Sequence, residues 1–293
     1  MTSAPTSAPK AGVKQTSPQK TGAQNTPGTS DLHSDLCATA HEMADAARAA
    51  ILPFFRTDIP ADNKLATGFD PVTEADRAAE VAMRAVLARR RPNDAILGEE
   101  FGSTAGGSGL TWVLDPIDGT RGFISGTPTW GVLIALSDDT GPIMGVIDQP
   151  FIGERFFGGF GHARYDGPHG HGALAVRATQ TLAEATIFTT FPEVGTPQEA
   201  AAFGRVAGQC RLTRYGMDCY AYALLAAGQV DLVIEAGLNP YDIQGPIAVI
   251  QAAGGIVTDW AGGPAHHGGQ AIAAATPELH AAALALLNTG ADA

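Results

Sequence analysis

Apolar and polar positions follow two different periods along the chain, and the change of period predicts where helices give way to strands. In residues 31–55 apolar side chains recur every three or four positions, from Leu32 to Ile51, and Pro53 follows them. That spacing predicts one amphipathic helix, which the proline ends. Residues 70–92 begin with a turn signal and repeat the spacing, with basic residues near the end that suit the helix dipole. Two helices therefore open the folded part of the chain.

Short apolar runs separated by glycine, proline and aspartate come next, and they predict strands. Residues 95–100 read as a short strand that runs into acidic residues, and the Gly/Ser-rich residues 101–109 read as a mobile loop. Residues 163–176 read as a hairpin or loop that leads into another strand. Four further strands are predicted at 111–117, 129–137, 142–150 and 154–161.

Strands and helices alternate in the second half of the chain, and the rhythm changes near residue 175. This order predicts mixed sheets layered with helices, an α/β or α+β fold. We expect an N-terminal part at 31–174 and a C-terminal part at 175–293. Strands are predicted at 185–191, 211–216, 230–237 and 256–262, and helices at 197–210, 217–229, 242–255 and 277–289.

Residues 1–30 differ from the rest in composition. They are mostly Ser, Thr, Pro, Gly, Ala, Gln and Lys, and they contain no aromatic residue and no acidic one. Such a segment cannot bury enough surface to offset its ordering entropy, so it is predicted to be a disordered tail. It has no apolar run of the kind that a secretory signal peptide contains.

Composition and charge limit the classes of function. The 293 residues are 45% hydrophobic and 16% charged, which predicts a sizeable core. The net charge of −12 argues against binding to nucleic acid or to an anionic membrane. No apolar run reaches the length of about 20 residues that a membrane helix needs. Three widely spaced cysteines suggest no disulfide framework, so we expect a cytoplasmic protein.

Residues 112–120, "WVLDPIDGT", place Asp115 and Asp118 at the end of an apolar run. Carboxylates at the edge of a core are unfavourable unless a cation compensates them. Side chains three apart on a strand face opposite sides, so these two converge only if the strand ends between them. Pro116 favours that end because it lacks an N–H. Two carboxylates and the Ile117 carbonyl are then ligands suited to Mg²⁺.

The next residues, Gly119 and Thr120, predict a turn or short helix whose amides could hold an anion such as phosphate. Taken alone, the motif is better explained by a strand end with solvated aspartates and a helix cap. Three other acidic stretches strengthen the metal interpretation: "DPVTEAD" at 70–76, "GEE" at 98–100 and "NPYDIQG" at 239–245.

These four stretches, in this order, resemble the inositol monophosphatase superfamily of metal-dependent phosphatases. The resemblance runs from about Asp31 to the C-terminus, and the D-P-x-D-G-T motif is its strongest part. It implies a layered αβαβα sandwich, two or three Mg²⁺ per site, a small phosphorylated substrate and a homodimer. It implies that the C-terminal part completes a site whose metal and phosphate motifs lie in the N-terminal part.

The resemblance also assigns roles by position. The implied metal ligands are Glu99, Asp115, the Ile117 carbonyl, Asp118 and Asp242. Asp70 and Thr120, with Glu99, match the groups that orient and activate the attacking water, while Gly119 and Thr120 match the phosphate-binding amides. Metal ions a few ångströms apart can activate the water and stabilise the leaving oxygen.

Within the family, residues 118–136, 214–243 and 252–260 look most like the histidinol-phosphate phosphatase branch. Arg121, Asp218 and Glu235 then become candidate specificity residues, because carboxylates suit a substrate with an ammonium group and an imidazole. Pro246 must lie in the first helical turn to be tolerated there, and the segment 244–246 could shift Asp242. The alternatives are an inositol-1-monophosphatase, a phosphatase of broad sugar and nucleotide range, and a non-catalytic regulatory protein.

Overall fold

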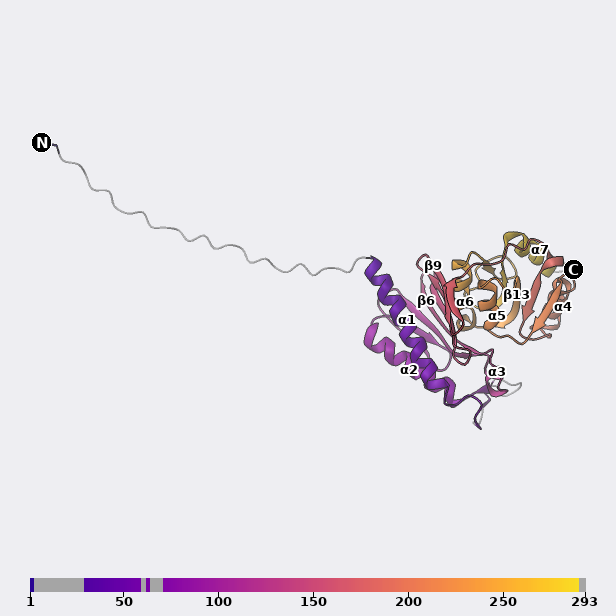
Figure 1. Cartoon of the computed structure of the whole chain (residues 1–293), viewed down its shortest axis with the longest axis horizontal. Helices are drawn as coiled ribbons and strands as arrows, with labels where there is room; N and C mark the ends of the chain where they lie inside the picture. Colours follow the sequence, from indigo (N-terminus) through magenta and orange to yellow (C-terminus); the bar gives the residue numbers. More distant parts are fainter. Residues whose placement is uncertain (3–28, 59–61, 64–70, 290–293) are drawn as a thin grey trace.

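A computed structural model shows five layers in the order helix, sheet, helix, sheet, helix (Figure 1). It describes residues 1–2, 29–58, 62–63 and 71–289, so most of the predicted tail lies outside the described residues. Within those ranges no helix is long and apolar enough to span a membrane.

The first sheet has eight strands in the order β10-β9-β8-β7-β6-β5-β3-β4. All neighbours are antiparallel except β3 and β5, which are parallel. The predicted strands between 95 and 161 are confirmed, and 163–176 forms a hairpin. The loop predicted at 101–109 is wrong in part, because three of its residues pair with β3 as an exposed edge strand. The strands are β3 (Ala95–Gly98), β4 (Gly102–Thr104), β5 (Thr111–Asp118), β6 (Gly131–Asp138), β7 (Gly141–Gln149), β8 (Glu154–Gly159), β9 (His162–Gly167) and β10 (Gly170–Ala173).

The second sheet has five strands in the order β12-β11-β13-β15-β14. Four of them match the sequence prediction, and the one missed, β15, lies between β13 and β14. A separate pair, β1 (Asp62–Asn63) and β2 (Pro71–Val72), forms a small antiparallel sheet. The five strands are β11 (Thr186–Thr189), β12 (Leu212–Tyr215), β13 (Leu232–Leu238), β14 (Ile256–Thr258) and β15 (Gly269–Ala274).

Helices cover both outer faces and fill the space between the sheets (Figure 1). α1 and α2 pack on the eight-stranded sheet, α5 and α6 lie between the sheets, and α4 and α7 lie outside the five-stranded sheet. This arrangement is the αβαβα order that the resemblance implied. The helices are α1 (Thr29–Ile51), α2 (Glu74–Arg90), α3 (Thr120–Ile124), the 3₁₀ turn η1 (Leu182–Glu184), α4 (Pro197–Ala207), α5 (Tyr220–Ala226), α6 (Pro240–Ala252) and α7 (Pro277–Leu287).

α6 sits unusually close to the first sheet because glycines allow it. A Cβ atom on Gly145 would collide with the backbone of Gly245, and one on Gly158 would lie 2.5 Å from the Cα atom of Val249. The expected place of Pro246 in the first helical turn is wrong. The helix begins earlier, at Pro240, so Pro246 lies inside it and lacks the N–H that would donate to the carbonyl of Asp242.

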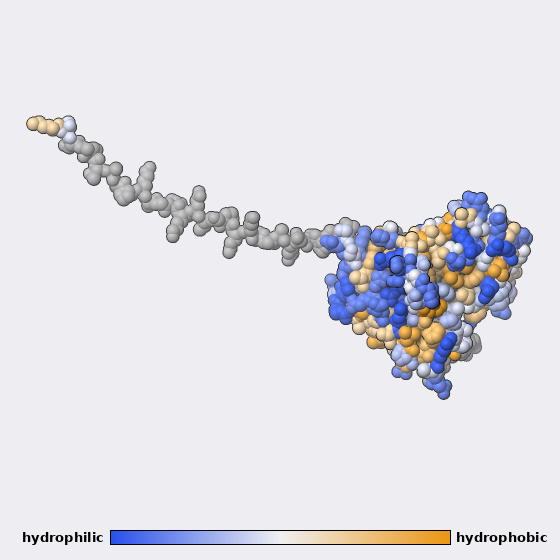
Figure 2. Space-filling view, viewed as in Figure 1, coloured by the Kyte–Doolittle hydropathy of each residue, from blue (hydrophilic) through white to orange (hydrophobic). Residues whose placement is uncertain are grey.

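Hydrophilic residues cover the side of the molecule where α1 lies in the space-filling view (Figure 2). Ion pairs join α1 to α2 there. The Arg90 guanidinium donates to Asp35 at 2.6 Å and to Glu42 at 2.8 Å, and Arg91 lies 3.5 Å from Asp35. Surface pairs of this kind each contribute about 0–1 kcal/mol, so the apolar face that α1 buries stabilises the layer more.

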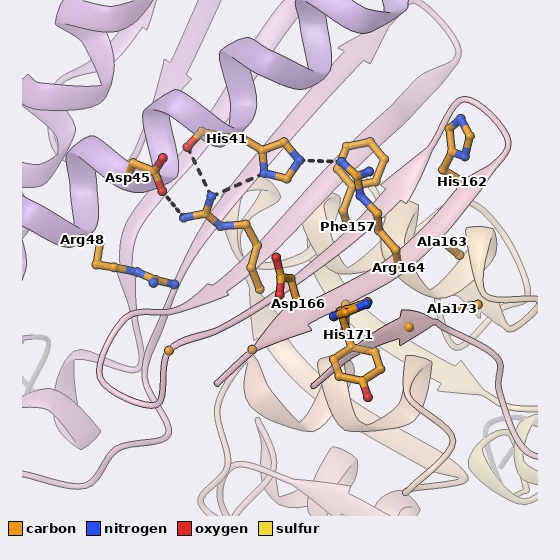
Figure 3. Close-up of a pocket in the computed structure, with 15 residues that line it drawn as sticks. His41, Asp45, Arg48, Phe157, His162, Ala163, Arg164, Asp166, His171 and Ala173 are labelled. Atoms are coloured by element: carbon orange, nitrogen blue, oxygen red, sulfur yellow. Dashed lines mark hydrogen bonds and ion pairs between the residues drawn. The ribbon is translucent and has the colours of Figure 1, made fainter. Parts of the chain in front are cut away.

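A cavity of about 800 Å³ lies between α1 and strands β8 to β10, away from the acidic motifs (Figure 3). Two arginines approach one imidazole there. Arg155 Nη1 is 3.4 Å from His41 Nδ1, and Arg164 Nη2 is 3.0 Å from His41 Nε2. Arg155 also pairs with buried Asp148 at 2.6 Å. Burial, and then the two guanidinium groups, lower the pKa of His41 to about 4, so the imidazole is neutral at pH 7.

We predict that His41 makes the fold acid-sensitive. Its folded pKa of about 4 lies below the unfolded value of about 6.5, so the unfolded chain binds more protons between these values and stability falls as pH drops through them. After allowance for solvent screening, we expect this group to lower the free energy of unfolding by roughly 1–2 kcal/mol as the pH drops. Urea unfolding of the wild type and of His41→Gln at pH 7 and pH 4.5 measures the effect.

The variant should lose less stability between the two pH values than the wild type does. His162→Gln, which removes an exposed histidine from the same cavity, serves as the matched control. Parallel losses in the wild type and in His41→Gln would contradict the prediction.

Candidate active site

A bulge in β5 brings the two aspartates of the central motif onto one face. Asp115 pairs with Leu133 and Asp118 with Gly131, so one extra residue is inserted into β5 between the two pairs. The strand therefore continues through both aspartates, and the expectation that it ends between them is wrong. The bulge itself turns Asp118 to the side that Asp115 faces, and Pro116, which cannot donate to the ladder, lies within it.

A third carboxylate, from the start of α6, completes a compact acidic cluster. Oxygen atoms of Asp115, Asp118 and Asp242 all lie within 4.8 Å of one another. Asp242 occupies this position because it closes a capping box, in which its carboxylate accepts from the Asn239 N–H at 2.7 Å. The segment 244–246 therefore leaves Asp242 in the cluster.

The electrostatics of this cluster favour a cation. Asp115 is only 2% exposed, and its Oδ1 atom has no hydrogen-bond partner among the described residues. Burial, and then the charges of Glu99, Asp118 and Asp242, raise its pKa well above the usual value. Burial and neighbouring carboxylates likewise raise the pKa of Asp118, although an N–H bond from Cys219 at 2.6 Å opposes this. Carboxylate oxygens that repel one another in this way are suited to a hard divalent ion.

Helix α2 fixes the position of Glu99. The Glu80 side chain, which is fully buried in α2, accepts hydrogen bonds from the Glu100 N–H at 2.7 Å and the Phe101 N–H at 3.3 Å. Gly98 allows this approach, since a Cβ atom there would collide with the Glu80 carboxylate. Glu99 is thereby held beside Asp115, whose pKa it raises.

Thr120 contacts a carboxylate that the sequence analysis did not select. Its Oγ1 atom lies 3.1 Å from the Ile117 carbonyl oxygen and 3.4 Å from Oδ1 of Asp76. Asp76 is the N3 residue of α2 and accepts from the Thr73 N–H at 2.8 Å and the Thr73 hydroxyl at 2.6 Å. Asp70, the predicted partner of Thr120, lies outside the described residues.

The turn after β5 requires glycine. Gly119 has a φ of 86°, and a Cβ atom there would lie 2.7 Å from the Asp218 carboxyl carbon. Asp218 itself has a φ of 47° and accepts from the Thr129 hydroxyl at 3.1 Å. Burial raises its pKa, while that hydrogen bond and the charge of Arg121 oppose the shift.

A second buried carboxylate, Glu235 on β13, has its hydrogen bonds satisfied by two threonines. Thr189 donates its hydroxyl to Oε2 at 3.0 Å, and Thr190 donates its N–H and hydroxyl to Oε1 at 2.6 and 2.9 Å. Burial raises the pKa of Glu235 to about 7 despite these bonds.

One cavity of about 270 Å³ unites these groups. Apart from Asp70, every residue that the sequence selected lines it, although their roles remain proposals. Its lining also includes residues that the sequence analysis did not select, among them Phe191, Cys219 and Tyr222, because an aromatic residue or a thiol outside a motif gives no signal. The predicted residues are Glu99, Asp115, Ile117, Asp118, Gly119, Thr120, Arg121, Asp218, Glu235 and Asp242.

Comparison with known proteins agrees with this geometry. Residues 33–290 match the model of the inositol monophosphatase family. A bifunctional phosphatase from Arabidopsis thaliana is 41% identical over 78% of this chain, which spans only 65% of that relative. A histidinol-phosphatase from Streptomyces coelicolor is 36% identical over 85% of this chain and 95% of its own length.

A solved structure gives the same result. An inositol monophosphatase from Zymomonas mobilis superimposes with a TM-score of 0.77 and 39% identity, and the match covers 87% of this chain and 98% of the other. The match to the family model covers nearly all of the chain, and the relatives agree with it. The chain therefore belongs to the inositol monophosphatase family and is a phosphomonoester hydrolase.

Proposed function

We propose that this phosphatase depends on Mg²⁺ and hydrolyses L-histidinol phosphate to L-histidinol and phosphate. The observation that carries the substrate is the pair Asp218 and Glu235, two carboxylates that line the cavity beyond the proposed metal ligands. Their negative charge would attract the ammonium group of this substrate. The Streptomyces coelicolor relative, named a histidinol-phosphatase, supports the same choice.

The residues present fit Mg²⁺. Glu99, Asp115, Asp118 and Asp242 supply carboxylates and Ile117 a carbonyl, the oxygen donors that this ion prefers, and Asp115 keeps an oxygen without a partner among the described residues. Bound ions, two or three per site, would supply charge neutralisation for the phosphoryl oxygens and a lower pKa for a bound water.

The chain's own groups orient the water and the phosphate. Thr120, held between Asp76 and the Ile117 carbonyl, can accept the hydrogen bond of an attacking water while its own proton points to a carboxylate. We assign Asp76 to this role from its contact, and Asp70 remains a prediction from the resemblance. The amides of Gly119 and Thr120 are the proposed phosphate contacts, and Arg121 follows them into the same cavity.

The alternative substrate is inositol-1-phosphate or a range of sugar and nucleotide monophosphates. The likeness to the Zymomonas mobilis inositol monophosphatase supports it. The homodimer and a place in histidine biosynthesis remain predictions from the resemblance, and the cytoplasmic location remains a prediction from the cysteines. Light scattering of the purified protein tests the homodimer.

The choice between the two substrates is tested by kinetics. The ratio of kcat/KM for histidinol phosphate to kcat/KM for inositol-1-phosphate distinguishes them.

We predict that Asp118→Asn abolishes activity yet stabilises the metal-free protein. The folded pKa of Asp118 is raised, so its ionisation opposes folding as pH rises above the unfolded value of about 4. Asparagine removes that charge and can still accept from the Cys219 N–H. Thermal unfolding in chelator at pH 7.5 should show a higher Tm for the variant.

Added Mg²⁺ should raise the Tm of the wild type more than that of the variant. Asp139→Asn, which changes an exposed aspartate immediately after β6, is the matched control. Near wild-type kcat in Asp118→Asn would refute the metal assignment.

We predict that Thr120→Val and Asp76→Asn lower kcat far more than they raise KM, by roughly 10²- to 10⁴-fold, because proton handling acts in the transition state. Valine keeps the shape of the threonine and removes the hydroxyl. Steady-state kinetics of each variant and of the double variant measure the effect. Losses that multiply in the double variant would show that the two residues act separately, against the proposed pair.

We predict that Glu235→Gln and Asp218→Asn reduce kcat/KM for histidinol phosphate by roughly ten- to a hundredfold, the value of a charged hydrogen bond. Each change removes charge and keeps the side-chain size. Hydrolysis of 4-nitrophenyl phosphate, which has no ammonium group, should change much less. The wild-type preference for histidinol phosphate should also weaken below about pH 7, where Glu235 takes up a proton.

Equal losses on both substrates would show that these carboxylates support the fold or the metal ions. In that case the histidinol assignment would lose the observation that carries it, while the phosphatase activity would stand.

A further inference from the structure

Phe191 is an exposed aromatic residue at the cavity that holds the carboxylates. It is 43% exposed, in the loop between β11 and α4, and it lines the same cavity as Asp115, Asp118 and Asp242. Its exposed surface is available to a ligand that enters the cavity, and covering that surface would remove apolar area from water.

The neighbours of Phe191 fix where the ring lies. Thr189 and Thr190, immediately before it, donate three hydrogen bonds to Glu235. On the other side, the guanidinium carbon of Arg121 lies 4.9 Å from the centroid of the Phe191 ring. Arg121 follows Thr120 directly, so this contact joins the second sheet to the segment that carries the proposed water and phosphate contacts.

The cavity therefore has two kinds of lining. The β5 end supplies carboxylates and the α3 amides, where metal ions and phosphate are proposed to bind. Phe191 and Arg121 supply a planar aromatic ring and a planar guanidinium, and the apolar residues Ala236 and Leu238 belong to the same cavity. Flat groups of this kind favour a flat partner, because aromatic rings stack on one another and on guanidinium planes.

We propose that Phe191 and Arg121 form a wall on which a planar heteroaromatic ring of the leaving group stacks. The wall selects phosphomonoesters whose alcohol carries such a ring over those of saturated polyols, and Phe191 is a specificity-determining residue. A saturated polyol has a puckered ring without π electrons, so it cannot stack on the Phe191 ring as closely as a flat aromatic ring does. The inference rests on the proposed phosphatase function and adds the shape of its leaving group.

Two substrates isolate the ring. Histidinol phosphate carries a phosphate ester, an ammonium group and an imidazole, and 2-aminopropyl phosphate keeps the first two without the ring. Their kcat and KM are measured for the wild type, for Phe191→Leu, which keeps an apolar side chain, and for Phe191→Tyr, which keeps the aromatic ring.

We expect Phe191→Leu to lower kcat/KM for histidinol phosphate about three- to tenfold, mainly through KM, the range for loss of one aromatic pair. The value for 2-aminopropyl phosphate should change less than twofold, and Phe191→Tyr should retain the wild-type ratio of the two substrates.

Two results would overturn the inference and leave the phosphatase standing. One is a wild type that hydrolyses both substrates equally well, and the other is an equal loss, or no loss, on both in Phe191→Leu. A wild type that hydrolyses neither substrate but does hydrolyse inositol-1-phosphate would instead refute the histidinol proposal, and the wall with it.

Discussion

Repulsion among clustered carboxylates, one buried and two half-buried, is the constraint on which the rest of the structure depends. Asp115, Asp118 and Asp242 hold oxygen atoms within 4.8 Å of one another in surroundings that raise the pKa of the first two. Such a cluster opposes folding unless the fold is stable enough to hold it or a cation neutralises it. The surrounding elements can be understood as the means by which the chain holds these groups in place.

Three elements do most of this work. The β5 bulge turns Asp118 toward Asp115, the capping box of α6 holds Asp242, and buried Glu80 of α2 fixes the segment that carries Glu99. α6 reaches the cluster because glycines let it lie directly on the first sheet. The site thus depends on the packing of α2, β5 and α6 rather than on a mobile loop.

The other residues that line the cavity include one more carboxylate, Glu235, and two flat groups. Glu235 accepts three hydrogen bonds from Thr189 and Thr190. It lines the cavity and has no ion-pair partner among the described residues. Arg121 and Phe191 lie beside it as a pair of flat groups. A single loop therefore positions both an acidic and an aromatic part of the cavity lining, because Phe191 follows the threonines that hold Glu235.

The sequence by itself determined most of the elements and the acidic motifs, because helix and strand periods and the D-P-x-D-G-T spacing are local. It missed β15, whose alanine-rich residues have little intrinsic strand preference and become a strand only by pairing with β13 and β14. It also placed Pro246 in the wrong turn, because the helix start depends on the Asn239 cap.

Contacts between distant segments were decided by the tertiary structure alone. From its neighbours Asp76 reads as a helix cap, and only the packing of α2 beside β5 brings it to Thr120, 44 residues away. Phe191 gave no signal at all, since an aromatic residue at the end of an apolar run is indistinguishable from a core residue. Its exposure follows from where the loop after β11 leaves the sheet, which no local pattern specifies.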